Sequence, residues 1–250
     1  MKKLGALVAA AALMITGCGS SSGGSESQTL TVFAAASLTE SFTGLKTAFE
    51  SAHPGTEVKF NFAGSSALVQ QLSNGARADV FASADQANMD KAVQAGVVDG
   101  APSVFATNRL TIAVAPGNPK GITGFADLAR VGLTVIVCAP QVPCGSAAEK
   151  VERSTGVTLR PASEEQDVKQ VLNKVQTGDA DAGLVYVTDA ASAAGKVGRV
   201  DFPEAAQAVN SYPIAVVKDA PRAGLAKQWV EFVLGEQGRA ELQKAGFGAP

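Results

Sequence analysis

The chain has 250 residues, of which 46% are apolar and 18% are charged, a composition typical of a globular protein with a substantial core. Its length suits one large domain or two small ones. The formal net charge is -2, and the sequence contains neither a basic block nor interleaved basic and aromatic residues. A nucleic-acid partner is therefore not expected.

Residues 1–17 have the features of a bacterial lipoprotein signal peptide. Two lysines precede an apolar stretch, residues 4–15, which is too short to span a bilayer. The stretch ends in Ile-Thr-Gly-Cys, which resembles a lipobox and makes Cys18 the expected lipidation site. Residues 18–28 then form a Gly/Ser-rich tether. The lipoprotein interpretation predicts an extracytoplasmic protein held by lipid to the outer face of the cell membrane; an ordinary secretory signal with an incidental cysteine is the alternative.

Residues 29–108 are expected to alternate strands with helices. Strands are expected at residues 31–35, 57–62 and 79–82, with helices after Ser37, after Ser65 and Ser66, and over residues 84–95. The first strand ends in three alanines before Ser37, and Glu40 follows three residues later, an S-x-x-E pattern typical of a helix N-cap. The second strand also runs through small residues into serines and a helix.

Residues 109–250 continue the alternation of strands and helices. Strands are expected at residues 109–115, 133–137, 182–187, 197–202 and 211–218, and two helices are expected in the C-terminal tail. Ser146 and Glu149 form another S-x-x-E pattern. Asp167 is favoured over Ser163 as an N-cap, because the apolar repeat of the following helix begins at Val168. The alternation predicts an α/β fold.

Two cysteines, Cys138 and Cys144, remain after the proposed lipidation site. Secreted proteins meet an oxidising environment, so a disulfide between them is expected. A redox-active pair is the alternative, although the spacing is not the C-x-x-C of thiol oxidoreductases.

Four predicted helix starts carry small or hydroxyl residues and are the candidate binding groups. They are Ser37, Ser65 with Ser66, Gly145 with Ser146, and Asp167 with Val168. The N–H groups of a first helical turn have no intrahelical acceptor and can bind an anion. Tyr186 ends an apolar strand, where its hydroxyl could reach the same place. Ordinary capping explains each helix start alone, whereas the set favours an anion at converging helix ends.

Enzymatic chemistry has little support in the sequence. The single histidine, His53, lies beside a proline in a predicted turn, and no His, Cys or Glu cluster has metal-ligand spacing. A serine hydrolase using Ser37 or Ser65 would have no other histidine for a triad, and no G-x-S-x-G motif occurs. Neither a catalytic site, a resident cofactor nor a directly coordinated metal is expected.

Six segments in this order resemble the periplasmic molybdate-binding proteins of ABC importers. They are TVFAAASLTE, FAGSSAL, ADVFASAD, QVPCG, EEQDVKQVL and GLVYVTDA. The resemblance covers nearly all of residues 29–247. It implies a type II solute-binding fold of two lobes, each a mostly parallel sheet flanked by helices, with a cleft between them. Residues 29–108 plus 216–250 would form one lobe and residues 109–215 the other, with hinge strands near residues 109–115 and 213–218.

The resemblance also implies a ligand and its contacts. Molybdate or tungstate would be bound by neutral donors alone, namely the hydroxyl or N–H groups of Ser37, Ser65, Cys144, Val168 and Tyr186. Cys144 departs from the family, in which alanine is common, but its donor would be the main-chain N–H. A monomer working with an ABC permease and its ATPase is expected. Another tetrahedral oxyanion or a small organic solute is the alternative ligand.

Overall fold

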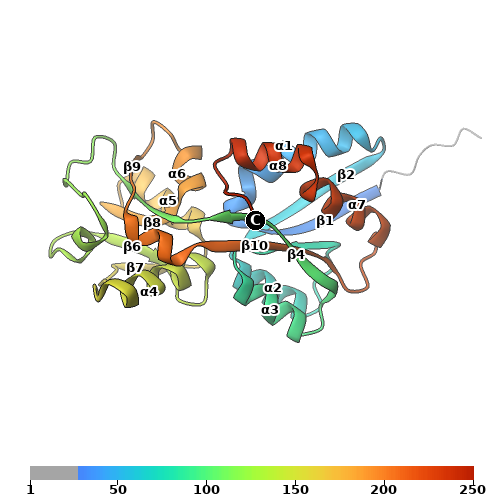
Figure 1. Cartoon of the computed structure of the whole chain (residues 1–250), viewed down its shortest axis with the longest axis horizontal. Coiled ribbons are helices and arrows are strands. Elements are labelled where there is room, and N and C mark those ends of the chain that lie inside the picture. Colours follow the sequence, from blue (N-terminus) through green and yellow to red (C-terminus); the bar gives the residue numbers. More distant parts are fainter. Residues whose placement is uncertain (1–27) are drawn as a thin grey trace, which may run out of the picture.

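The computed structural model describes residues 28–250, which form two five-stranded sheets, each flanked by helices (Figure 1). The predicted signal peptide, the tether up to residue 27 and the lipidation site Cys18 lie outside the described residues. Among the helices of residues 28–250, none is both long enough and apolar enough to cross a membrane.

The first sheet has the strand order β2-β1-β3-β10-β4. Its strands are β1 (Gln28–Ala35), β2 (Thr56–Ala63), β3 (Val80–Ala82), β4 (Val98–Asn108) and β10 (Asn210–Val217). The helices around it are η1 (Ala36–Leu38), α1 (Thr39–Ala52), α2 (Ser65–Ser73), α3 (Gln86–Gln94), α7 (Ala223–Leu234) and α8 (Glu236–Lys244). The long strand β4 was not predicted.

The second sheet has the strand order β7-β6-β8-β5-β9. Its strands are β5 (Leu110–Val114), β6 (Val135–Cys138), β7 (Ser163–Glu165), β8 (Ala182–Tyr186) and β9 (Gly198–Val200). The helices of this lobe are η2 (Phe125–Ala129), α4 (Pro143–Thr155), α5 (Val168–Thr177), α6 (Val187–Ser192) and η3 (Pro203–Ala208).

The predicted two-lobed α/β architecture is confirmed, and each sheet is mixed. In the first sheet β1 pairs in parallel with β2 and β3, whereas β10 is antiparallel to β3 and β4. In the second, β6 is parallel to β7 and β8, whereas β5 is antiparallel to β8 and β9. β5 and β10 each follow a crossing between the lobes, so both strands run away from the other lobe. Their antiparallel neighbours run in the opposite direction.

Aromatic packing anchors one face of the first sheet. Trp229 of α7 is fully buried, and its ring lies 5.1 Å from that of Phe49 and 5.7 Å from that of Phe42, both on α1. The predicted inward face of α1, which also includes Leu45, is buried as expected. Aromatic side chains of this size dominate the packing energy of a hydrophobic core. They therefore hold α1 and α7 firmly against the sheet whose strand ends face the second lobe.

The chain crosses between the lobes twice. The first crossing is the single residue Arg109 between β4 and β5, and the second lies between η3 and β10. Residues 210–215, which the resemblance placed in the second lobe, pair with β3 and β4 instead. We therefore propose lobe limits of 28–108 plus 210–250 and 109–209, with the hinge at the two crossings rather than within β5 and β10. The C-terminus lies beside the first crossing, since Gly248 pairs with Thr107 (Figure 1).

Candidate functional site

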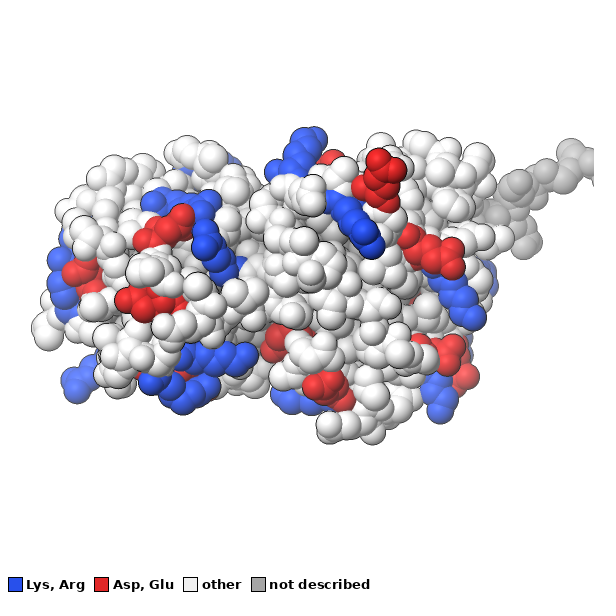
Figure 2. All heavy atoms as spheres, viewed as in Figure 1, with Lys and Arg blue, Asp and Glu red and all other residues white. Residues whose placement is uncertain are grey.

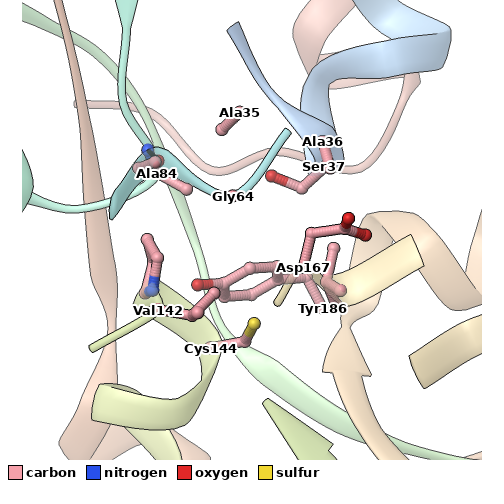
Figure 3. A pocket seen from close by; sticks show the side chains of 12 residues that line it. Ala35, Ala36, Ser37, Gly64, Ala84, Val142, Cys144, Asp167 and Tyr186 are labelled. Carbon is pink, nitrogen blue, oxygen red and sulfur yellow. Dashed lines mark hydrogen bonds between the residues drawn. The ribbon is translucent and has the colours of Figure 1, made fainter. Parts of the chain in front are cut away.

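A small cavity between the lobes brings together all five predicted ligand residues (Figure 3). Its lining comprises Ala35, Ala36, Ser37, Gly64, Ser65, Ala84, Val142, Pro143, Cys144, Asp167, Val168 and Tyr186. About 10 Å³ of it is open to the centres of water-sized spheres, on the order of one water molecule. A tetrahedral anion has four oxygen atoms, so the lobes must separate slightly to admit one.

Helix starts point their N–H groups toward this cavity from both lobes. Ser65 and Val168 are the first residues of α2 and α5, and Cys144 is the second residue of α4. Ser37 is the second residue of the 3-10 turn η1 that leads into α1. Backbone N–H groups at these positions have no acceptor within their own helix, and they carry the positive end of the helix dipole.

The predicted capping box at Ser37 is wrong. The helical turn already begins at Ala36, so Ser37 lies inside the first turn and makes no side-chain cap. Its hydroxyl lies instead 3.0 Å from the Tyr212 hydroxyl of β10. Glu40, the other half of the predicted box, binds Lys169 of the opposite lobe.

Ser65 is fully buried, and its Oγ accepts a hydrogen bond of 3.0 Å from the Ala84 N–H. Because the oxygen already accepts, its proton remains available to donate into the cavity. Ser66 is only partly buried and is not among the residues lining the cavity.

The Cys138–Cys144 disulfide is formed, with the two Cα atoms 5.6 Å apart. It ties the end of β6 to the first turn of α4, and so restrains the Cys144 N–H. The predicted cap at Ser146 is wrong, because Pro143 opens α4 and Val142 occupies the N-cap position. Gly145 is required there: a β-carbon would overlap the carbonyl oxygen of Ala139.

Asp167 is the N-cap of α5, as predicted, and accepts a hydrogen bond of 3.0 Å from the Gln170 N–H. The preceding residue, Gln166, touches the other lobe. A β-carbon at Gly64 would overlap the Gln166 carbonyl oxygen. Glycine at position 64 therefore permits the lobes to close around the cavity.

Tyr186 ends β8 and is almost fully buried, as is the second tyrosine of the chain, Tyr212, with ring centroids 6.0 Å apart. The Tyr186 hydroxyl accepts a hydrogen bond of 2.8 Å from Asn210 Nδ2. Burial, followed by the neighbouring Tyr212 and the carboxylate of Asp85, raises the pKa of Tyr186 well above its usual value. The phenol therefore remains a hydrogen-bond donor at physiological pH.

No cationic side chain is among the residues that line the cavity. Lys169, near its rim, is paired with the carboxylates of Glu40 at 2.7 Å and Asp189 at 3.0 Å. Burial would lower the pKa of Lys169, but the carboxylates of Asp189 and Glu40 outweigh it and raise the pKa. On the outer face in Figure 2, acidic and basic side chains are interspersed, without a large patch of one sign.

Two site-adjacent residues, Asn210 and Tyr212, were missed from the sequence. Both lie on β10, which the sequence predicted as a strand without assigning it to the cleft. A usable signal was present, because Tyr212 is one of only two tyrosines in the chain. Within residues 28–250, no group of three or more His, Cys, Asp or Glu residues could hold a metal ion.

Comparison with known proteins agrees with this geometry. Residues 30–248 match the family model described as bacterial extracellular solute-binding protein. The molybdate-binding protein ModA of Mycobacterium tuberculosis is 51% identical, with 96% of this chain and 95% of that protein covered. ModA of Escherichia coli is 32% identical, with 87% and 88% covered.

A solved structure extends the comparison to the fold. The periplasmic molybdate-binding protein of Azotobacter vinelandii superposes with a TM-score of 0.78 at 23% identity, over 88% of this chain and 99% of that one. At this identity the match supports the fold alone. The two-lobed architecture, the family model and the relatives agree: the chain belongs to the bacterial extracellular solute-binding proteins.

Proposed function

We propose that this protein captures molybdate outside the cytoplasm and delivers it to an ABC permease driven by its ATPase. Ser37, Ser65, Cys144, Val168 and Tyr186 are the proposed ligand contacts. The observation that carries the proposal is the meeting of all five in one cavity between two lobes. The names of the relatives at 51% and 32% identity support molybdate as the solute. A solute-binding protein is a transport component, not an enzyme.

The donor set suits a fully deprotonated oxyanion. Molybdate and tungstate are tetrahedral dianions without a proton at neutral pH, and a buried dianion must receive hydrogen bonds on every oxygen. Charge-assisted hydrogen bonds from N–H and hydroxyl donors are shorter and stronger than neutral ones. The helix dipoles of α2, α4 and α5 add favourable potential at their N-termini. Neutral donors therefore suffice, and tungstate is an expected second ligand.

Closure of the lobes would convert binding into a signal for the permease. Glu40 of α1 binds Lys169 of α5 across the cleft, and Asn88 of α3 donates to the Gln141 carbonyl at 3.4 Å. Donors from both lobes reach the ligand only when the lobes are close, so the ligand stabilises the closed form over the open one. The permease would then recognise the closed form by its shape.

The proposal extends to attachment and assembly. Cys18 would carry lipid that holds the protein, as a monomer, at the outer face of the cell membrane. Membrane fractionation of the wild type and of C18A tests the anchor: the wild type should sediment with membranes and the variant should not. Sedimentation of both forms would point to another anchor. Light scattering of the purified protein tests the monomer.

Isothermal titration of the purified protein with molybdate, tungstate, sulfate and phosphate tests the ligand. Molybdate and tungstate should bind, and each should raise the melting temperature as ligand concentration exceeds Kd. Sulfate and phosphate at equal concentration should do neither. Binding of sulfate alone would show that the ligand is a different tetrahedral oxyanion. Absence of binding heat with all four anions would refute an oxyanion site.

A further inference from the structure

A fully buried carboxylate, that of Asp189, lies close to the second-lobe side of the cavity. Asp189 is in the first turn of α6, and its Oδ2 accepts a hydrogen bond of 3.2 Å from the Tyr186 N–H. Its Oδ1 lies 3.0 Å from the Nζ atom of Lys169, which follows Val168 at the start of α5. One carboxylate therefore contacts the two elements, α5 and β8, from which Val168 and Tyr186 reach the cavity.

Lys169 is the only ion-pair partner of this carboxylate within residues 28–250. Apart from the ion pair, Asp189 Oδ1 has no hydrogen-bond partner in that part of the chain. The other ionisable groups that act on the pair are Tyr186 of β8, Tyr212 of β10 and Glu40 of α1. Strand β5, which also packs against α6, carries no ionisable side chain. Compensation of the Asp189 charge therefore depends on one ammonium group.

Burial makes the ionisation of Asp189 sensitive to Lys169. Burial raises the pKa of the Asp189 carboxyl, and the Lys169 ammonium is the strongest influence that lowers it. Burial would lower the pKa of Lys169, but the carboxylates of Asp189 and Glu40 outweigh it, so Lys169 stays charged. Without this ammonium, Asp189 would lose its proton only at a higher pH, and it would then be a buried charge without a partner.

The charge of Asp189 acts on the Tyr186 hydroxyl, a proposed ligand contact. The pKa of Tyr186 is raised by burial first, and then by Tyr212, Asp85 and Asp189. A carboxylate that disfavours a phenolate in this place also disfavours an oxyanion bound there, because both bring negative charge to the same part of the protein. Lys169 is not among the residues that line the cavity, so it offsets this repulsion without contact with the ligand.

We propose that Lys169 is a positioning residue that offsets the buried charge of Asp189 and so keeps oxyanion affinity high and constant across neutral pH. This inference rests on the proposed function, because it concerns how the cavity holds a dianion. The one histidine of the chain, His53, follows the C-terminal end of the 14-residue helix α1, whereas Ser37 precedes its N-terminal end. No histidine near the cavity would therefore impose a pH dependence of its own.

The test compares the wild type with K169M and K169M/D189N, and K174M is the matched control. Lys174 lies on the same helix and pairs with Glu165, and neither residue lines the cavity. Isothermal titration with molybdate measures Kd between about pH 6 and about pH 8.5, a range in which a buried, unpaired carboxyl can titrate. Thermal unfolding without ligand follows the ionisation of Asp189 over the same range.

The Kd of the wild type, of K169M/D189N and of K174M should stay constant over this range. In K169M the Kd should rise by about tenfold or more toward the alkaline end, because Asp189 ionises there without an ammonium to offset it. The melting temperature of ligand-free K169M should fall over the same range. Its folded-state pKa for Asp189 is raised above the unfolded value, and stability is lost as pH rises through it. K169R should restore the constant Kd.

A constant Kd in K169M would overturn the inference, whether or not its melting temperature falls. A pH-dependent Kd that persists in K169M/D189N would also overturn it. If K169M does not fold, D189N replaces it, because asparagine still accepts from the Tyr186 N–H and lacks the charge. Its Kd should equal or lie below that of the wild type, and weaker binding would reduce Asp189 to a structural role and overturn the inference.

The wild-type titrations separate failure of this inference from failure of the proposed function. If the wild type binds sulfate instead of molybdate, the proposed ligand is wrong, and the same series measured with sulfate decides the role of Lys169. If the wild type binds none of the four anions, both proposals fall.

Discussion

Lys169 of one lobe and Glu40 of the other are joined across the cleft, with Lys169 Nζ 2.7 Å from Glu40 Oε2. Lys169 also lies 3.0 Å from the buried carboxylate of Asp189, within its own lobe. One ammonium group therefore serves a contact that exists only when the lobes meet and another that persists when they part.

Removal of the Glu40 carboxylate should affect closure of the lobes and leave the stability of the protein without ligand nearly unchanged. Glu40 is half exposed, so its ion pair contributes at most about 1 kcal/mol. We expect E40Q to weaken molybdate binding by up to about fivefold, with little change in melting temperature without ligand. Titration at low and high salt checks the cause, because the difference from wild type should shrink as salt screens the pair. A difference that grows with salt would contradict this assignment.

The contact between Gly64 and Gln166 should be the most sensitive test of closure. In G64A the added β-carbon overlaps the Gln166 carbonyl oxygen only in the closed form. Gly64 has φ -60° and ψ 138°, which alanine adopts freely, so the fold should be unaffected. We expect molybdate affinity to fall by about 5- to 150-fold, which corresponds to the cost of roughly 1–3 kcal/mol typical of overpacking.

The control for this change is G224A. Gly224 has open space around the position of a β-carbon and lies in α7, which contributes no residue to the lining of the cavity. Its affinity should equal that of the wild type. Equal affinities for G64A and wild type would mean that ligand binding does not require this approach of the lobes.

Adjacent serines offer a matched pair at the start of α2. Ser65 lines the cavity and Ser66 does not. Loss of one donor to a buried charge costs about 1.5–3 kcal/mol, so S65A should weaken binding by roughly 10- to 150-fold and S66A by little. Calorimetry of both variants provides the measurement. Wild-type affinity in S65A would remove Ser65 from the ligand contacts.

Reduction of the Cys138–Cys144 bridge should impair binding more than folding. A loop this short contributes about 2 kcal/mol or somewhat more in the chain-entropy model. Its effect on the site comes from holding the first turn of α4 against β6. After reduction verified by thiol titration, the loss of binding free energy for molybdate should exceed the loss of unfolding free energy. Unchanged affinity would limit the bridge to a stabilising role.

Alkaline pH should reveal the buried tyrosines. The folded-state pKa of both Tyr186 and Tyr212 is raised by burial, whereas an unfolded tyrosine ionises near about 10. Above that pH the unfolded chain releases protons that the folded chain retains, so stability must fall as pH rises. Melting temperatures should be insensitive to these groups below about pH 9 and should decline above 10. Y212F should show a shallower decline.

Local patterns were sufficient for most elements, whereas the full set of five candidate ligands depended on the family resemblance. The apolar face of α1 and the N-cap at Asp167 follow from residue spacing alone. The capping boxes at Ser37 and Ser146 failed because a competing start lay one to three residues earlier, at Ala36 and Pro143. Helix starts are set by a few hydrogen bonds, so such small shifts are energetically close and hard to predict.

The sequence by itself determined the α/β class and the order of most strands and helices, and it offered candidate donors at predicted helix starts, because these features depend on periodicity and residue type. Only the tertiary structure decided which residues form hydrogen bonds with those donors from the side away from the cavity. Asn210 and Tyr212 reach Tyr186 and Ser37 across 24 and 175 residues of chain. Such contacts depend on strand order and on the crossing before β10, and no local pattern encodes either.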